Sequence, residues 1–395
     1  MNTLHALRRS FSLPRRSFSL PRRERGMSLI ELMVGMLIGL IGIIIITHLY
    51  VTNEQYKRST TGSGTAQVNG AIALYTLERD VRMSGYGINH SGALGCTTTV
   101  PGGSPIQYYH ANEGYSNPPL ATGTLPPLIL APIVITQPTV LPGPDTITLL
   151  YSSDAERALP GTLSESMPSP SAEFKMDGVA GFEVGNLVVV AQGATCALTQ
   201  ITTVQTSASQ LQHNPGVTAP FNPPGGGNLL PAFTQGALVF NLGNPIWRTY
   251  SIDTNPAANA YKLQVADIVG LLAPGANLPV HLVDDIVDLQ AQYGRDTNDD
   301  GVVETWDTNT PTTSTGWTQV LAVRIGILTR SGNYDRPSVA GGACEATLAI
   351  PAWSGYTESG AVGDRFTIPG GVPSCYKYRV FENTIPLRNM IWRPA

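Results

Sequence analysis

The sequence predicts an α+β protein: a long N-terminal helix, with a membrane-spanning first half and an amphipathic second half, packed on an antiparallel β-sheet domain with loop-rich insertions. Three observations predict this fold class. Residues 27–51 are almost entirely apolar and contain no proline. Apolar residues then recur every three or four positions up to Met83, which is typical of an amphipathic helix. Finally, 41 Gly and 31 Pro, with short β-rich runs, indicate strands joined by loops rather than a helical bundle.

The apolar run is long enough to cross a hydrocarbon core of roughly 30 Å as a helix. Residues 1–26 before it carry seven Arg and one Glu, a charge of +6, so the remaining chain carries −10. A basic flank keeps that end in the cytoplasm and sends the following domain outward. The acidic remainder argues against nucleic-acid binding, which needs a basic surface.

Glu31 is the one acid in the apolar run. A carboxylate at this depth is costly in lipid and usually has a partner. Because the membrane part of the sequence up to Leu32 offers no cation, we infer that the partner comes from another chain.

The residues around Gly26, Met27-Ser28-Leu29-Ile30 and Glu31 resemble the class III leader junction of type IV pilins and type II secretion pseudopilins. The resemblance implies that prepilin peptidase removes residues 1–26 by cutting after Gly26 and methylates the new N-terminus at Met27. It also implies that Glu31 meets the N-terminal amine of a neighbouring subunit. The alternative is an ordinary signal anchor with a coincidental Gly and Glu.

Residues 27–52 are therefore the expected transmembrane and assembly helix, and residues 53–87 its amphipathic continuation. Two glycines in the stretch Ser59–Thr65 cost about 1 kcal/mol each against alanine, which predicts a local loosening. The expected apolar stripe beyond it consists of Val68, Ala71, Leu74, Leu77 and Val81. The expected exposed face carries Glu78, Arg79, Asp80 and Arg82, and the glycines at 85 and 87 should end the helix.

Residues 88–395 form the expected β-rich domain on the periplasmic or extracellular side. Its predicted strands are 146–151, 187–191, 200–205, 237–242, 247–252, 261–265, 287–293, 320–329 and 376–382. The segments 77–87, 320–328 and 379–389 are similar to minor pilins of the PilW type.

Four cysteines are widely spaced and contain no C-x-x-C pair, which in an exported domain predicts two disulfides. Of the three possible connectivities, we expect Cys344 with Cys375, closing a short loop, and Cys96 with Cys196. Free buried thiols are the alternative.

An acidic loop begins at residue 296 and places oxygen ligands in the order of an EF-type calcium loop, with Gly301 at position six. We expect Ca²⁺ to bind there, with weak affinity suited to extracellular calcium. A solvated turn between two strands is the alternative. The candidate ligands are Asp296, Asn298, Asp300, the carbonyl of Val302, Glu304 and Asp307.

No catalytic motif accompanies these features. The six His form no H-E-x-x-H pattern, and the glycine clusters lack the Lys-Ser/Thr of a phosphate loop. We therefore expect no enzyme activity.

The resemblance implies a minor pilin that inserts in the inner membrane with its N-terminus in the cytoplasm and is then extracted into a type IV pilus at the cell surface. Its implied role is in priming, assembly or tip architecture, and hence in adhesion and twitching motility. The implied partners are other minor and major pilins, prepilin peptidase, the inner-membrane assembly platform and an adhesin-like tip protein. Two alternatives are a type II secretion pseudopilin and a membrane-anchored, calcium-dependent adhesin module that never polymerises.

Overall fold

The computed structural model describes residues 26–98, 119–120, 123–124 and 129–391, except 141, 155, 215–218, 220, 223–231, 256–259, 272–278, 336, 338–341, 345, 348, 350, 357–364 and 369–374. Apart from Gly26, the expected leader lies outside these residues. The chain forms two compact units, Met1–Tyr56 and Lys57–Ala395. The second unit is called the head below.

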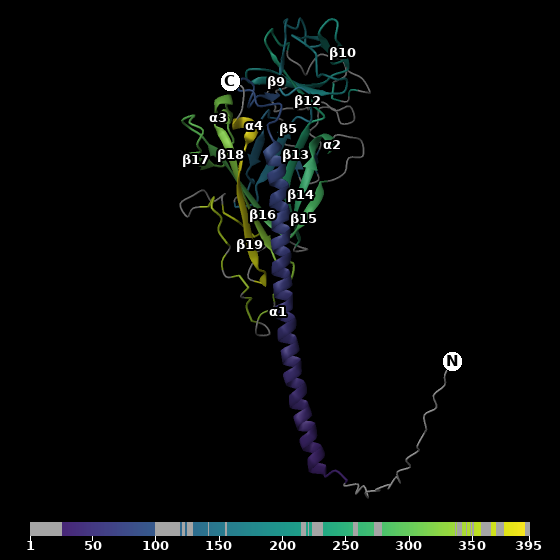
Figure 1. Ribbon diagram of the computed structural model, residues 1–395, viewed down its shortest axis with the longest axis vertical. Helices are drawn as coiled ribbons and strands as arrows, with labels where there is room; N and C mark the ends of the chain where they lie inside the picture. Colours follow the sequence, from purple (N-terminus) through teal and green to yellow (C-terminus); the bar gives the residue numbers. More distant parts are fainter. Residues whose placement is uncertain are drawn as a thin grey trace, which may run out of the picture. The chain divides into compact units, whose positions relative to one another are not determined.

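Helix α1 (Leu29–Met83) runs for 55 residues without a break (Figure 1). The loosening expected at Ser59–Thr65 is therefore wrong. The helix stops where glycines follow it: Gly85 and Gly87 adopt φ values of +81° and +76°, which favour glycine. The predicted end of the helix is confirmed.

In the head, α1 buries a different face from the one predicted. Val68 is 57% exposed and Ala71 is also exposed, so the predicted stripe is correct only towards Leu77 and Val81. The buried positions before Leu77 are small residues, which let the sheet come close: a Cβ added at Gly70 would overlap the ring of Phe381. The buried positions of α1 are Gly62, Ala66, Gly70, Ala73, Leu77, Asp80 and Val81.

Two antiparallel sheets hold the head half of α1, which runs between strands β15 and β19 in Figure 1. Side-chain contacts reach both edges: Asn69 Nδ2 donates to the carbonyl of Asp284 at 3.0 Å, and the Phe381 ring lies against Gly70. The first sheet has the order β17 (Thr305–Asp307), β16 (Ile286–Arg295), β18 (Val320–Arg330) and β19 (Tyr378–Pro386). The second has the order β15 (Val280–Asp284), β14 (Ala260–Asp267), β13 (Ile246–Asn255), β5 (Thr146–Tyr151) and β4 (Ile133–Thr136).

A single hydrophobic core joins α1 to both sheets, with Leu77, Ile147, Leu263, Leu289 and Ile325 among its fully buried members. Most predicted strands lie where the sequence placed them, because runs of β-branched and apolar residues form strands such as β8 (Leu187–Gln192) and β18 that are buried along nearly their whole length. The prediction for 200–205 is the exception, because it spans the end of one strand and the start of the next. Three short helices adjoin these strands in the chain: α2 (Ile268–Leu271) after β14, α3 (Ser314–Thr318) before β18 and α4 (Arg388–Ile391) after β19.

Residues 153–243 form a lobe inserted between the neighbouring strands β5 and β13. It has its own core, which includes Phe174, Val188, Leu211 and Val239, and Figure 1 places it at the end of the head where α1 stops. One of its sheets has the order β1 (Thr97–Thr98), β9 (Thr195–Gln200), β8 (Leu187–Gln192), β12 (Leu238–Gly243) and β6 (Gly161–Thr162). The other has the order β10 (Thr203–Gln205), β11 (Gln210–Gln212) and β7 (Phe174–Lys175). A separate pair consists of β2 (Pro119–Leu120) and β3 (Gly123–Thr124). The described elements confirm the α+β fold class.

Asp80 is buried, contrary to the prediction that it lies on the exposed face, because two residues of β13 donate hydrogen bonds to its carboxylate. Its side chain is 3% exposed. Asp80 Oδ2 accepts a hydrogen bond from Arg248 Nη1 at 2.9 Å and from the hydroxyl of Tyr250 at 2.6 Å. Burial, with the hydrogen bond to Asp80, raises the pKa of Tyr250. Burial acts to lower the pKa of Arg248, but the bond to Asp80 outweighs it and the pKa rises. This anchor ties the last turn of α1 to the second sheet.

Candidate processing, assembly and cation sites

The predicted processing and assembly residues lie at the start of α1. Gly26 and Met27 precede its first turn, and Met27 is 70% exposed. Glu31 is exposed within that first turn, where the positive end of the helix dipole favours a carboxylate. The backbone before it is already helical, since the N–H of Leu32 donates to the carbonyl of Ser28 at 3.1 Å. Met27 and Glu31 are four residues apart, about one helical turn, and both side chains are exposed to a partner.

The apolar side chains that follow are exposed. By length and composition α1 can cross a membrane near its N-terminal end. Large apolar side chains in water are costly in proportion to their area, so this stretch needs lipid or other helices around it. The exposed set is Leu29, Ile30, Leu32, Met33, Val34, Met36, Leu37, Ile38, Leu40, Ile41, Ile43, Ile44, Ile45, Ile46, Leu49, Tyr50 and Val51.

The acidic loop between β16 and β17 brings three predicted ligands together. One oxygen each from Asp296, Asp300 and Glu304 lies within 4.8 Å of the others. Asp296 is 3% exposed, whereas Asp300 and Glu304 are exposed. Asp299 and Gly301 adopt φ values of +61° and +84°, so the chain turns sharply at the position where an EF-type loop has its glycine.

Backbone N–H groups already occupy part of this oxygen set. Asp296 accepts from the N–H of Asp300 at 3.2 Å and of Gly301 at 2.7 Å. Burial acts to raise the pKa of Asp296, but backbone hydrogen bonds, first that from Gly301, lower it overall. Asn298 Oδ1 also accepts from Asp300 N, and Glu304 accepts from the N–H of Thr297 at 2.8 Å. These oxygens are nevertheless suitable ligands for a hard cation, because each carboxylate oxygen that accepts a hydrogen bond keeps a second lone pair.

Two of the predicted ligands differ from the rest. Asp307 lies in β17, and its carboxylate is held by Arg295 through bonds of 2.6 Å from Nε and 3.0 Å from Nη2. The structure therefore pairs it with a cation of the protein rather than with the other loop acids. Val302, the predicted carbonyl ligand, has a side chain 61% exposed, and its N–H donates to Asp300 Oδ1 at 2.8 Å.

Both expected disulfides are present, Cys96–Cys196 and Cys344–Cys375. The first joins the chain just after α1 to strand β9 of the lobe, beside the parallel pairing of β1 with β9. The second closes a loop next to the start of β19. Cys96 and Cys196 lie in a buried apolar cluster with Leu187 and Phe240, so the first disulfide is part of a core of the head.

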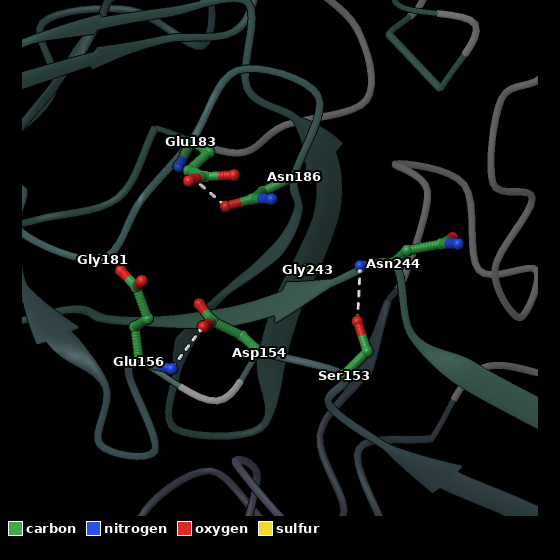
Figure 2. A pocket seen from close by; sticks show the side chains of 8 residues that line it. All are labelled: Ser153, Asp154, Glu156, Gly181, Glu183, Asn186, Gly243 and Asn244. Carbon is green, nitrogen blue, oxygen red and sulfur yellow. Dashed lines mark hydrogen bonds between the residues drawn. The ribbon is translucent and has the colours of Figure 1, made fainter.

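A polar pocket that sequence reasoning did not predict lies at the neck of the lobe (Figure 2). Its volume is about 220 Å³, and it lies where the chain leaves β5 at Ser153 and returns at Gly243. Among the described residues, neither His nor Cys lines it. The buried Asn241 holds two of the lining residues: its amide donates to the carbonyl of Gly181 at 2.7 Å and to Asn186 Oδ1 at 3.1 Å. The lining residues are Ser153, Asp154, Glu156, Gly181, Glu183, Asn186, Gly243 and Asn244.

Comparison with known proteins gives two family matches at opposite ends of the chain. Residues 21–47 match the prokaryotic N-terminal methylation motif. Residues 249–389, about a third of the chain, match type IV pilus-assembly protein W. No curated protein and no solved structure matches.

The first match contains the predicted cleavage position and Glu31, and the second contains the sheet of β16 to β19 with its acidic loop. The lobe of residues 153–243 lies outside both. Pilins of this family are structural proteins that interact with other pilus components. The two matches confirm the resemblance: the chain carries a prokaryotic N-terminal methylation motif and a region similar to type IV pilus-assembly protein W.

Proposed function

We propose that this protein is a minor pilin that takes part in priming, assembly or tip architecture of a type IV pilus. The observation that carries the proposal is the presence of both family matches on one chain; α1 begins within the first match, and its Gly70 lies against Phe381 of the second. Before assembly the protein would sit in the inner membrane with its N-terminus in the cytoplasm and its head outside. Its partners would be other minor and major pilins, the assembly platform and an adhesin-like tip protein.

The proposed cleavage after Gly26 is tested on protein recovered from cells. Mass spectrometry of the mature N-terminus should find a chain that begins with N-methylated Met27. An intact leader on protein recovered from fibres would contradict the proposal.

Glu31 is proposed to guide α1 into the fibre by pairing with the N-terminal amine of a neighbouring subunit. A charge pair inside an apolar assembly is far stronger than one in water, because little solvent screens it. Glu31→Gln, which keeps the shape but loses the charge, should insert in the membrane normally and be depleted from purified pili. Glu31→Asp, which keeps the charge, is the matched control and should be incorporated better than Glu31→Gln.

Equal incorporation of the wild type and Glu31→Gln would contradict this role. If the N-terminus is also uncut, the non-polymerising adhesin module becomes the better explanation. A processed protein that co-purifies with a secretion pseudopilus instead of pili would favour the type II secretion alternative.

We further propose that the acidic loop binds Ca²⁺, supported by the convergence of Asp296, Asp300 and Glu304. Binding to the folded state alone raises stability according to ligand concentration. Millimolar calcium should therefore raise the melting temperature of the wild type but not of the Asp300→Asn, Glu304→Gln double variant. Identical melting of the wild type in calcium and in chelator would support the plain turn.

A further inference from the structure

The stretch of α1 from Arg58 to Ala66 is helical although its sequence disfavours helix. It contains Gly62 and Gly64 among serines and threonines, all poorer helix formers than alanine. Short helical segments with low propensity depend on tertiary contacts for their stability. The reason for its order must therefore lie outside the helix.

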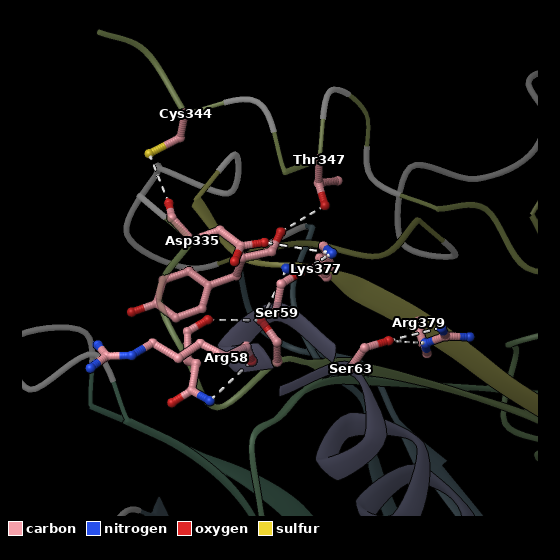
Figure 3. A network of polar contacts seen from close by, with 11 residues as sticks. Arg58, Ser59, Ser63, Asp335, Cys344, Thr347, Lys377 and Arg379 are labelled. Carbon is pink, nitrogen blue, oxygen red and sulfur yellow. Dashed lines mark hydrogen bonds and ion pairs between the residues drawn. The ribbon is translucent and has the colours of Figure 1, made fainter. Parts of the chain in front are cut away.

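The contacts come from two strips of the head, residues 329–335 and 375–379, which approach α1 together (Figure 3). Lys377 Nζ donates to Ser59 Oγ. One turn later, Arg379 donates to Ser63 Oγ from Nε at 3.2 Å and from Nη2 at 2.9 Å. These serines are four residues apart, so both hydroxyls face the same side of the helix.

The backbone of α1 is held on the same side. Asn333 Nδ2 donates to the carbonyl of Arg58 at 3.4 Å, and Thr329 Oγ1 donates to that of Ala66 at 3.3 Å. A Cβ added at Gly62 would lie 3.3 Å from that of Ser331. The glycine thus allows the close approach that brings these polar groups to the helix.

The two strips are fixed to each other. Ser331 N–H donates to the carbonyl of Lys377 at 2.7 Å, and Asp335 N–H donates to the carbonyl of Cys375 at 2.8 Å. Asp335 Oδ2 lies 3.8 Å from Lys377 Nζ. The disulfide between Cys344 and Cys375 then closes the segment that connects the strips. We call this set, residues 329–335 and 375–379 with the disulfide, the bracket.

We propose that the bracket keeps α1 helical from Arg58 to Ala66, so that the order of this stretch depends on the folded, disulfide-closed C-terminal loop. Farther along, Leu77 and Val81 are fully buried in the core and do not need it. The side chains of Lys377 and Asp335 are 41% and 24% exposed, so their contacts are individually modest and open to solvent, whereas Thr329 and Ser331 are buried. Loss of the Lys377 contacts or of the disulfide therefore loosens this stretch of helix without unfolding the head.

Hydrogen exchange of the full mature protein in detergent micelles tests the proposal. Lys377→Met keeps most of the side-chain volume but loses the ammonium, and the Cys344→Ser, Cys375→Ser pair opens the loop. In either variant, amides of residues 57–66 should exchange about tenfold faster or more, while those of residues 73–81 keep their wild-type rate. Lys175→Met, which removes an exposed ion pair with Glu165 in the lobe, is the control and should change neither.

A rescue variant separates helix propensity from a general loss of stability. A Cβ at Gly64 meets no atom within 4 Å, so Gly64→Ala adds helix propensity without a clash. Added to Lys377→Met, it should slow exchange in residues 57–66 again. Unchanged exchange there in both bracket variants, equal acceleration throughout the head, or no rescue by Gly64→Ala would overturn the proposal.

Discussion

Replacing Asp80 with asparagine should destabilise the head by about 3 kcal/mol. Hydrogen bonds to a charged group contribute roughly 1.5–3 kcal/mol each, and the bonds from Arg248 and Tyr250 both lose their anionic acceptor. We take the lower end of that range for two reasons. The Arg248 side chain is 29% exposed, and Asp267 Oδ2 lies 3.8 Å from its Nε and remains as a second anion.

The assay is urea unfolding of the full mature protein in detergent, followed by tryptophan fluorescence, with a double-mutant cycle. Tyr250→Phe alone should lower the free energy of unfolding by about 1–2 kcal/mol, because a buried carboxylate loses one donor. The double variant should be less unstable than the sum of the single variants, with a coupling of about 1 kcal/mol or more.

Glu165→Gln is the control, because it also removes one carboxylate from an ion pair. Its side chain is 63% exposed, so its loss should be below about 0.5 kcal/mol. Additive losses for Asp80 and Tyr250, or a loss for Asp80→Asn as small as that of the control, would refute the view that this carboxylate anchors the helix.

Three further changes have defined outcomes. Burial raises the pKa of Asp288 to about 7, whereas an aspartate in the unfolded chain loses its proton near pH 4. The stability of the wild type relative to Asp288→Asn should therefore fall by up to about 4 kcal/mol as pH rises from 4 to 7, and then level off. A difference in urea unfolding that stays constant with pH would contradict this. Gly70→Ala should cost about 1–3 kcal/mol by overpacking against Phe381 despite its better helix propensity, whereas unchanged thermal melting would deny the close contact. The Cys96→Ser, Cys196→Ser double variant loses a disulfide that links positions 100 residues apart, so its free energy of unfolding in urea should fall by about 4 kcal/mol. A fall near zero would mean that packing alone holds the lobe.

Local sequence patterns predicted the features that local physics controls. The apolar run, the glycines after Met83 and the β-rich runs of strands such as β5 and β18 depend on neighbours in sequence, and they correctly located the helix and most strands. The motif at Gly26 and Glu31 is equally local.

The remaining features depend on residues that are distant in sequence. The charged neighbours of Asp80 in sequence predict an exposed face. Asp80 is buried instead because it binds Tyr250, which lies 170 positions away in the chain. Val68 fits an apolar period, but the sheet selected the glycine and alanine positions, where backbones can approach. The spacing of Asp307 suits a calcium ligand, and only the structure reveals that Arg295 competes for its carboxylate.

The head holds its helix in three ways that differ in strength along α1. At the end near Met83, the Asp80 anchor is buried, so breaking it leaves charged and polar groups without water. In the middle, Gly70 lets the helix pack tightly against Phe381. Near Arg58 the bracket contacts the helix through the buried Thr329 and through the partly exposed Lys377. Because more of the groups that hold α1 near Arg58 are exposed than near Met83, we expect backbone amides of residues 57–66 to exchange faster than those of residues 73–81.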